Sequence, residues 1–165
     1  MRALVQRARS AKVEVEGRIT GSIGRGLVVL LGVGRGDGDE QVAYLAEKIL
    51  RLRIFPGPER PLDRSVVDVQ GKILLVSQFT LYGDCRKGRR PSFDQAEEPG
   101  KAERVYRKFS RFLSEAGYPP EEGVFGASML VSLENDGPVT LLIDSDRRFT
   151  DSDRAGLIDT DRAGA

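Results

Sequence analysis

The sequence of 165 residues contains no histidine, no tryptophan and a single cysteine, Cys85. Histidine is the usual general base near neutral pH and the commonest metal ligand. A Ser-His-Asp triad, a Cys-His dyad and a histidine-ligated zinc site are therefore excluded within one chain. One cysteine excludes an intrachain disulfide and a thiolate cluster, and it favours a reducing compartment. An enzyme of this composition would use backbone groups, hydroxyls, carboxylates, lysine, arginine or a group of its substrate.

Long apolar runs are also lacking, because no window of the sequence approaches the about 20 apolar residues of a membrane-spanning helix. We therefore expect a soluble, cytoplasmic protein. The two signs of charge nearly balance, with 26 Lys and Arg against 25 Asp and Glu. The length fits one domain that buries a core without disulfides.

Apolar residues form short runs that are typical of β-strands. The run from Gly26 to Val33 is too apolar to alternate, so we expect it to be covered on both faces. A tight hairpin is expected at Glu16-Gly17. The expected strands cover residues 2–7, 11–16, 18–23, 26–33, 66–69, 72–81, 124–133 and 138–145.

Two segments carry apolar residues at steps of three and four, which predicts amphipathic helices. The first covers residues 39–54 with Asp39 as the N-cap, and the second covers residues 101–116 with Gly117 at its end. The pattern predicts an α+β domain with a largely antiparallel sheet, barrel-like or layered, and two packed helices. This domain would span residues 1–145, and the polar tail 146–165 is expected to be disordered because it has few apolar residues.

The loop Gly32–Gly38 follows a strand and precedes a helix, as a nucleotide-binding loop does. Its spacing is G-x-G-x-G-x-G, and it lacks the Lys-Ser/Thr of a P-loop. The strand-loop-helix unit also does not recur along the chain. We interpret the loop as a flexible connection.

A cationic segment spans residues 86–111, with nine Lys or Arg, four Asp or Glu and a local charge of +5. Such a segment in a nearly neutral protein favours local contact with phosphates over general coating of nucleic acid. A solvated helix face explains the same residues equally well. Phosphate contact becomes the better interpretation if an active site lies nearby.

Two polar motifs stand beside apolar strands. Ser77-Gln78-Phe79-Thr80 ends a very apolar run, so its polar groups face either a pocket or partners within the sheet. Thr80 has no base nearby and would be a poor nucleophile. Gly137-Pro138 is either an ordinary turn proline or a cis bond that points two carbonyls the same way.

These motifs combine with shorter ones in a recognisable set. The set comprises Ser77-Gln78-Phe79-Thr80-Leu81, Asn135-Asp136-Gly137-Pro138-Val139-Thr140, Arg90-Pro91-Ser92-Phe93, Gln6-Arg7-Ala8, Ala11-Lys12-Val13, Leu31-Gly32-Val33 and Arg53-Ile54-Phe55. Together these segments resemble the D-aminoacyl-tRNA deacylase family, also called D-tyrosyl-tRNA deacylases, which proofread chirality. The resemblance covers about residues 1–145.

The resemblance implies that the Gly137-Pro138 bond is cis and that each subunit of a homodimer inserts it into the active site of its partner. Backbone carbonyls would then exclude L-amino acids, so that rejection gives the specificity. Glycine has no side chain to reject, which makes mischarged glycyl-tRNA a second substrate. Arg7 is implied to brace the partner's Gly-Pro loop.

The resemblance also implies how hydrolysis proceeds, without metal or cofactor. The backbone around Phe79 and Thr80 would bind the terminal adenosine and stabilise the oxyanion, and the ribose 2′-hydroxyl would assist water. Thr80 is the one side chain considered as a nucleophile or proton relay, and substrate assistance is favoured over it. Ser77 and Gln78 would shape the wall, with Met129, Ala96 and Phe93 as further substrate-binding residues. The implied contacts to tRNA phosphates are Arg86, Lys87, Arg89, Arg90, Lys101, Arg104 and Lys108.

Two alternatives remain open from the sequence. One is a non-catalytic nucleic-acid-binding protein, which the cationic segment and the lack of a conventional base favour. The other is a related deacylase with a trans Gly-Pro bond and relaxed chirality.

Overall fold

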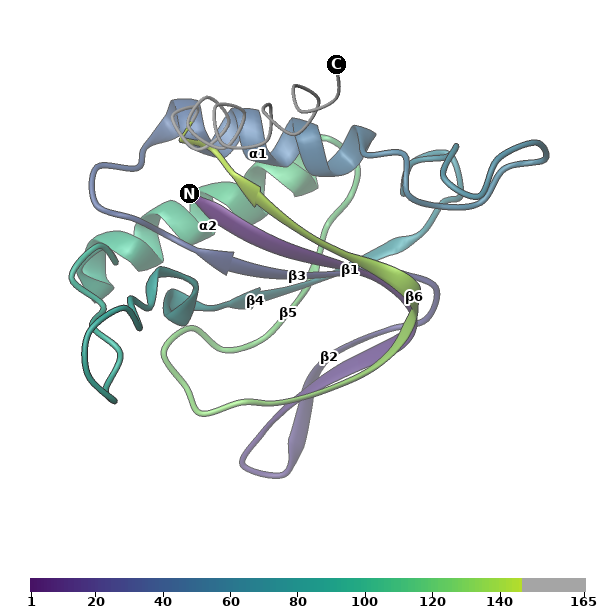
Figure 1. The fold of residues 1–165 in the computed structure, drawn as a ribbon. Coiled ribbons are helices and arrows are strands. Elements are labelled where there is room, and N and C mark those ends of the chain that lie inside the picture. The colour runs from purple at the N-terminus through teal and green to yellow at the C-terminus, as the bar shows by residue number, and fades with distance from the viewer. Residues whose placement is uncertain (147–165) are drawn as a thin grey trace, which may run out of the picture.

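The computed structural model describes residues 1–146, which fold into one mixed sheet with two helices on one side of it (Figure 1). The sheet order is β2-β1-β3-β4-β5, and β6 pairs with β1. The pairings of β1 with β2, β3 and β6 are antiparallel, while β3-β4 and β4-β5 are parallel. The elements are β1 (Arg2–Val15), β2 (Arg18–Ile23), β3 (Gly26–Gly32), α1 (Asp39–Arg51), β4 (Lys72–Ser77), the 3₁₀ helix η1 (Phe79–Tyr82), α2 (Pro99–Glu115), β5 (Glu121–Glu122) and β6 (Leu130–Asp144).

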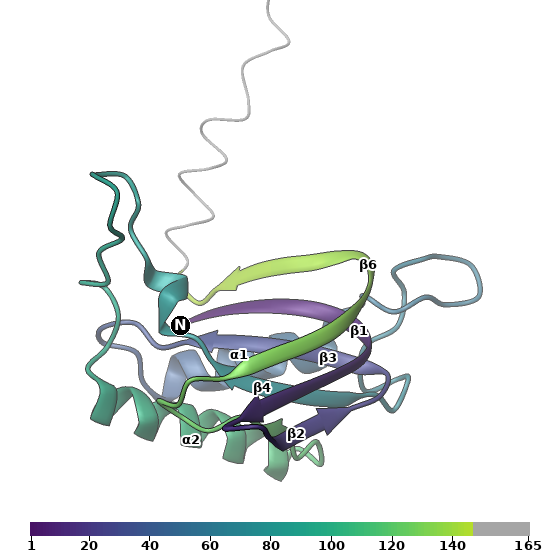
Figure 2. The ribbon, with the colours of Figure 1, turned by 90° about the horizontal axis from the view of Figure 1, so that it is seen from below.

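The sheet curls until β2 and β5, the two ends of the strand order, approach each other. Figure 2 shows β6 lying beside β1 over most of its length. A Cβ added at Gly21 of β2 would lie 2.8 Å from the Glu122 carbonyl oxygen of β5. Glycine at this position therefore lets the two strands come close. The predicted α+β, barrel-like fold with two packed helices is confirmed, and the two parallel pairings are the part that the sequence pattern missed.

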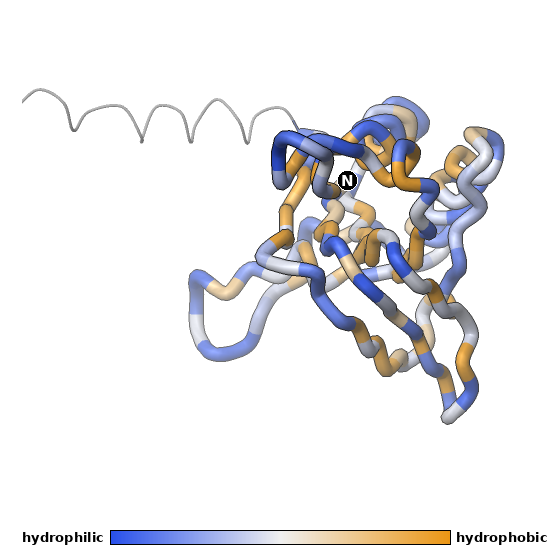
Figure 3. Tube along the Cα trace, turned by 90° about the vertical axis from the view of Figure 1, so that its right-hand side faces the viewer, coloured by the Kyte–Doolittle hydropathy of each residue, from blue (hydrophilic) through white to orange (hydrophobic). Residues whose placement is uncertain are grey.

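The central strands β3 and β4 are buried on both faces, as expected for the run that begins at Gly26. Leu27, Leu31 and Leu75 point to the cluster under the helices, whereas Val28 and Leu74 point into the curl of the sheet. Because strand side chains alternate between faces, one apolar run serves both clusters. Figure 3 shows hydrophobic and hydrophilic residues alternating along several extended segments of the chain.

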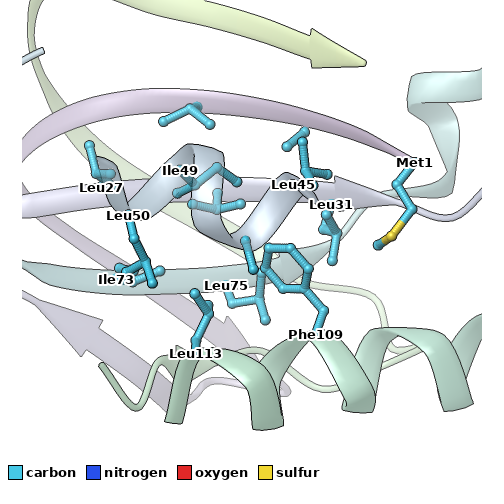
Figure 4. Packing of buried hydrophobic residues seen from close by; sticks show 14 of the residues in the cluster. Met1, Leu27, Leu31, Leu45, Ile49, Leu50, Ile73, Leu75, Phe109 and Leu113 are labelled. Atoms are coloured by element: carbon cyan, nitrogen blue, oxygen red, sulfur yellow. The ribbon is translucent and has the colours of Figure 1, made fainter. Parts of the chain in front are cut away.

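Both helices cover the same face of the sheet through their apolar stripes. Leu45 and Ile49 of α1 and Phe109 and Leu113 of α2 are fully buried, and they meet Leu75 of the sheet (Figure 4). Burying a side chain of this kind contributes about 1.5 to 3 kcal/mol. This core fixes the helices to the strands whose ends carry the polar motif at residues 77–80.

Several predicted boundaries are wrong for local reasons. The expected strand at residues 66–69 is a turn, in which Asp68 accepts hydrogen bonds from the N–H and hydroxyl groups of Ser65. The strand expected to reach residue 81 ends at Ser77. Helix α1 begins at Asp39 with Gly38 as its N-cap, and Gln41 accepts the hydrogen bond from the Gly38 N–H.

The terminal strands also differ from expectation. The runs at residues 2–7 and 11–16 form one strand, and the runs at 124–133 and 138–145 meet in one strand that begins at Leu130. The hairpin at Glu16-Gly17 is confirmed, and Gly117 after α2 adopts a φ of +85° that suits glycine. The tail predicted to be disordered lies outside the described residues, apart from Asp146.

Candidate active site

A pocket of about 640 Å³ opens where β3 and β4 end, between η1, the start of α2 and the segment before β6. Six of the residues predicted for the site line it together, which are Ser77, Gln78, Phe79, Phe93, Ala96 and Met129. Such a volume lies in the range that holds a small molecule or a cofactor-sized group.

The turn after β4 builds the floor of this pocket. The N–H of Gln78 still donates to the Leu31 carbonyl at 2.8 Å, after which the chain leaves the sheet. The N–H groups of Leu81 and Gly83 then donate to the carbonyls of Gln78 and Thr80 and close the turn η1. Within residues 1–146, neither the Phe79 N–H nor the Thr80 N–H has a hydrogen-bond acceptor. Two unpaired donors therefore stand at the start of a short helix, where an oxyanion can accept from them.

Two aromatic rings stand at the edge of the pocket. Phe79 is 58% exposed, although it is a large apolar side chain. Its ring contacts the Phe93 ring edge-on, with the centroids 5.0 Å apart. Phe93 belongs to a loop that is held by two hydrogen bonds between Asp84 and Ser92. The exposed ring leaves an apolar face open to a planar ligand.

The polar side chains of the motif point to one another. Gln78 Nε2 donates to Thr80 Oγ1, and Thr80 is exposed beside the pocket without lining it. Thr80 thus lies next to the predicted site, and its hydroxyl already accepts a hydrogen bond.

The predicted gate lies apart from this pocket. The Gly137–Pro138 bond is cis, and neither residue lines the pocket of its own chain. Arg7 is buried, and its Nε lies 2.9 Å from the Asp136 carbonyl oxygen and 3.0 Å from the Asp136 carboxylate. A second guanidinium nitrogen of Arg7 donates to the Ile54 carbonyl at 2.5 Å. Arg7 therefore fixes the loop of its own chain, whereas its predicted contact to a partner stays a prediction.

Asn135 completes the clamp around this loop. Its Nδ2 donates to the carbonyls of Arg7 and Val139, each at 3.1 Å. These bonds cross the loop at its base, so the exposed Gly137 and Pro138 stand on a fixed support. Asn135 belongs to a motif that carries the family resemblance, but the sequence predicts no role for it.

A family model described as D-Tyr-tRNA(Tyr) deacylase matches residues 4–144. The chain belongs to this family. It is 54% identical over 149 residues to a "D-aminoacyl-tRNA deacylase" of Clostridium kluyveri, covering 90% of this chain and 100% of that protein. It is 55% identical over 148 residues to a protein of the same name from Thermus aquaticus, covering 90% and 97% of the two chains.

Two solved structures share the fold of this chain. A protein described as "c-Myc DNA Unwinding Element Binding Protein" matches with a TM-score of 0.82 and 40% identity, covering 87% of this chain and 98% of that one. A "probable eukaryotic D-amino acid tRNA deacylase" matches with a TM-score of 0.72 at 22% identity, which speaks for the fold alone. The family resemblance stated from the sequence is confirmed.

Four charged residues that line this deacylase-family pocket were not predicted from the sequence. They are Arg35, Asp94, Glu97 and Glu98. Arg35 lies in the glycine-rich loop that was interpreted as a flexible connection. That loop is instead tied to the pocket wall, because the Arg35 N–H donates to the Gln95 carbonyl at 3.0 Å and the Gly34 N–H to Asp37 at 2.6 Å. The glycine spacing was the available signal, since a Cβ at Gly34 would lie 2.5 Å from the Tyr82 hydroxyl.

Glu97 joins three segments at the pocket rim. Its carboxylate accepts hydrogen bonds from Lys101 Nζ at 2.5 Å, from the Glu98 N–H at 3.1 Å and from the Gly36 N–H at 3.2 Å. These donors, Lys101 foremost, lower the pKa of Glu97 to about 2. The ionised carboxylate therefore holds the glycine-rich loop against the start of α2.

The predicted phosphate contacts divide into two groups. Arg86, Lys101 and Lys108 form ion pairs with Asp84, Glu97 and Asp39. The other four are Lys87, Arg89, Arg90 and Arg104, and they form no ion pair within the described part of the chain. Exposed ion pairs are weak, at about 0 to 1 kcal/mol, so phosphate can compete for the paired cations as well.

Two further features are absent from residues 1–146. No group of three or more His, Cys, Asp or Glu is arranged to hold a metal ion. No helix in the same range is long and apolar enough to cross a membrane.

Proposed function

We propose that the chain hydrolyses the ester bond between a D-amino acid and tRNA, releasing the free D-amino acid and tRNA. The observation that carries the proposal is the pocket beside the unpaired N–H groups of Phe79 and Thr80. Family membership supports the same substrate. The work belongs to translation quality control in the cytoplasm, where aminoacyl-tRNA is used.

The chemistry needs little from side chains, because an aminoacyl ester is already activated. The oxygen of water bonds to the ester carbonyl carbon, and the carbonyl oxygen takes up negative charge. The C–O bond to the ribose then breaks, and the proton lost by water passes to the ribose oxygen with help from the neighbouring 2′-hydroxyl. In a comparable oxyanion site, removing one hydrogen-bond donor costs about 2.7 to 4 kcal/mol. This route requires no imidazole and no nucleophilic side chain.

The terminal adenosine occupies the pocket in this proposal. Its base packs on the exposed ring of Phe79, with Phe93 and Met129 at its sides, and stacking of a base on an aromatic ring contributes about 1 to 3 kcal/mol. Ser77 and Gln78 form the wall, and Ala96 leaves room for the ribose.

The chirality gate comes from a second copy of the chain. Gly137 and Pro138 are exposed and stand away from their own pocket, as expected of a segment that serves a partner. Leu130 and Leu142 of β6 are 64% and 53% exposed, which supports an interface along this strand. Backbone carbonyls of the inserted loop would crowd the side chain of an L-amino acid. Glycine escapes this exclusion, so glycyl-tRNA is a second substrate.

The acceptor stem lies on the cationic segment. Its free cations, among them Arg89 and Arg90, are placed after the loop that carries η1 and before the pocket residue Phe93. Contacts from this segment to phosphates orient the stem without reading its sequence.

The test is the release of D-tyrosine from D-Tyr-tRNA compared with the release of L-tyrosine from L-Tyr-tRNA. We expect rapid hydrolysis of the D-ester and little of the L-ester, with glycyl-tRNA also cleaved. Equal turnover of the two enantiomers would contradict the proposal.

A second candidate is a nucleic-acid-binding protein without catalysis. The cationic segment and the 40% identical structure described as a DNA unwinding element binding protein favour it. It predicts that reversing the charges of Arg89, Arg90 and Lys108 removes all function, while changes at Gly137 do little. Loss of hydrolysis on enlarging Gly137, with tRNA binding retained, would decide against it.

A further inference from the structure

The turn η1 carries the proposed oxyanion donors and is held from its far end by a cluster of side chains. It packs on the end of β3, where a Cβ at Gly32 would lie 3.0 Å from the Gln78 carbonyl oxygen. A Cβ at Gly34 would lie 2.5 Å from the Tyr82 hydroxyl oxygen. Gly32 and Gly34 therefore allow η1 to approach the sheet closely. Its orientation is fixed by a separate set of side-chain contacts.

Arg2 supplies that fixation. One guanidinium nitrogen donates to the Leu81 carbonyl at 3.0 Å, and Nε donates to the Asp144 carboxylate at 2.8 Å. The guanidinium carbon also lies 4.5 Å from the centroid of the Tyr82 ring. Asp144 is 9% exposed and Arg2 is 28% exposed, so the pair is largely shielded from water. Arg2 thus joins the turn to β1 and β6 through three different groups.

Tyr82 forms the other side of the cluster. Burial and the nearby carboxylates of Asp37 and Asp144 raise the pKa of its hydroxyl above the ordinary value. Asp37 in turn accepts the hydrogen bond from the Gly34 N–H at 2.6 Å. The Tyr82 ring therefore lies between the Arg2 guanidinium on one side and the glycine-rich loop of the pocket wall on the other.

The consequence concerns the two donors in the same turn. Leu81 and Tyr82 follow Phe79 and Thr80 directly, so a rotation of the turn moves all four residues together. A displacement of about 1 Å in a catalytic group costs on the order of 100-fold in rate. We propose that Arg2, with Asp144 and Tyr82, is a positioning residue that aims the Phe79 and Thr80 N–H groups at the oxyanion. This inference rests on the proposed esterase function.

The test compares Arg2→Met with the wild type in two measurements. Hydrogen exchange of the Leu81 and Gly83 amides reports the turn itself, and single-turnover hydrolysis of D-Tyr-tRNA reports the chemistry. Arg2→Met should speed exchange at both amides about tenfold and lower the single-turnover rate constant about 10-fold to 100-fold, while the apparent Kd for tRNA changes less than threefold. Arg2→Lys, which keeps a charge but not the fork, should recover part of the rate.

Two further variants keep the test decisive. Asp144→Asn leaves the guanidinium in place and should give a smaller loss of the same kind, which serves if Arg2→Met does not fold. Arg18→Met, at an exposed arginine of β2, should match the wild type. Unchanged exchange, or faster exchange with an unchanged rate constant, overturns the inference. A wild type that releases no D-tyrosine overturns the proposed function instead, and exchange still shows whether Arg2 holds the turn.

Discussion

The pocket and the Gly137-Pro138 loop lie in one domain but are built in opposite ways. The pocket presents backbone donors and an exposed ring, with Phe79 58% exposed and the Phe79 and Thr80 N–H groups unpaired within the described chain. The loop is tied at its base by Arg7, which contacts the Asp136 carbonyl and carboxylate, and by Asn135, which donates to the Arg7 and Val139 carbonyls.

This contrast follows the two tasks that we propose. A site that stabilises charge needs free donors, since donors already paired cannot reach the oxyanion. A gate that works by exclusion needs a fixed shape, because a loop that yields would admit the wrong enantiomer. Substitutions in the loop should therefore change selectivity and stability, as well as the rate where the displaced loop disturbs the partner's pocket, whereas those in the pocket should change mainly the rate.

The largest effect is expected from Gly137→Ala. The added Cβ would lie 2.5 Å from Asn135 Oδ1, so the loop or the clamp must move. Because a displacement of about 1 Å can cost on the order of 100-fold, we expect hydrolysis of D-Tyr-tRNA to fall by about that factor. Deacylation kinetics measure it.

The matched control for this change is Gly24→Ala, where an added Cβ meets nothing within 4 Å. Its kinetics should equal those of the wild type. Normal rates and normal enantiomer selectivity in Gly137→Ala would show that the loop does not act as a gate.

The fold was largely predictable because its signals are local. Apolar runs at residues 26–33 and 72–81 predicted strands, and steps of three and four predicted both helices. The parallel pairing of β3 with β4 was not predictable in this way, because it depends on how α1 crosses the sheet. The turn at residues 66–69 was missed because a hydrogen bond from Ser65 to Asp68 outweighs the strand preference of valine.

The site residues that belong to a sequence motif were predictable. Those that come together only through the fold were not. Ser77, Phe79 and Met129 were identified through the family resemblance, and they do line one pocket. Arg35 and Glu97 were missed, because their glycine-rich loop and helix start meet only in the folded chain.

A smaller effect is expected from Arg7→Met, which removes the clamp but leaves the gate residues. Fully buried pairs lose about 3 to 5 kcal/mol when one partner is removed. We expect about 2 kcal/mol here, because Asp136 is 31% exposed and keeps contact with water. Urea unfolding measures the loss, and selectivity for the D-ester should fall with it.

Arg9→Met is the matched control, since Arg9 lies 3.9 Å from the same carboxylate but is 77% exposed. It should change the free energy of unfolding by less than about 0.5 kcal/mol. Equal losses in the two variants would mean that the clamp depends on charge near Asp136 and not on the buried contacts of Arg7.

In the pocket, Thr80→Ala should leave stability nearly unchanged and lower the hydrolysis rate less than about tenfold, because the backbone N–H remains. Thr80 is exposed, and its hydroxyl accepts from Gln78. Single-turnover kinetics measure the rate, with Thr20→Ala on β2 as the control. Hydrolysis abolished in Thr80→Ala and restored in Thr80→Ser would replace substrate assistance with side-chain catalysis.

The smallest effect concerns Glu97 at the pocket rim. Its pKa is lowered from 4.5 to about 2 by Lys101 and two backbone donors, so ionisation favours the folded state. This stability is present above pH 4.5 and is lost as the pH falls toward 2. Glu97→Gln should therefore reduce the free energy of unfolding at pH 7 by about 0.5 to 1 kcal/mol, a value kept small by solvent screening.

Urea unfolding of Glu97→Gln and the wild type at several pH values tests this directly. The difference between them should be constant above pH 4.5 and should shrink below it, because protonation removes the same charge in the wild type. Glu103→Gln removes another i,i+4 ion pair, that with Arg107, from a more exposed place and should have less effect at pH 7. If the difference in the free energy of unfolding persisted unchanged to pH 2, the charge of Glu97 would not be what holds the glycine-rich loop, and the shape of its side chain would be. The pocket rim would then resemble the fixed Gly137-Pro138 loop more than the open pocket.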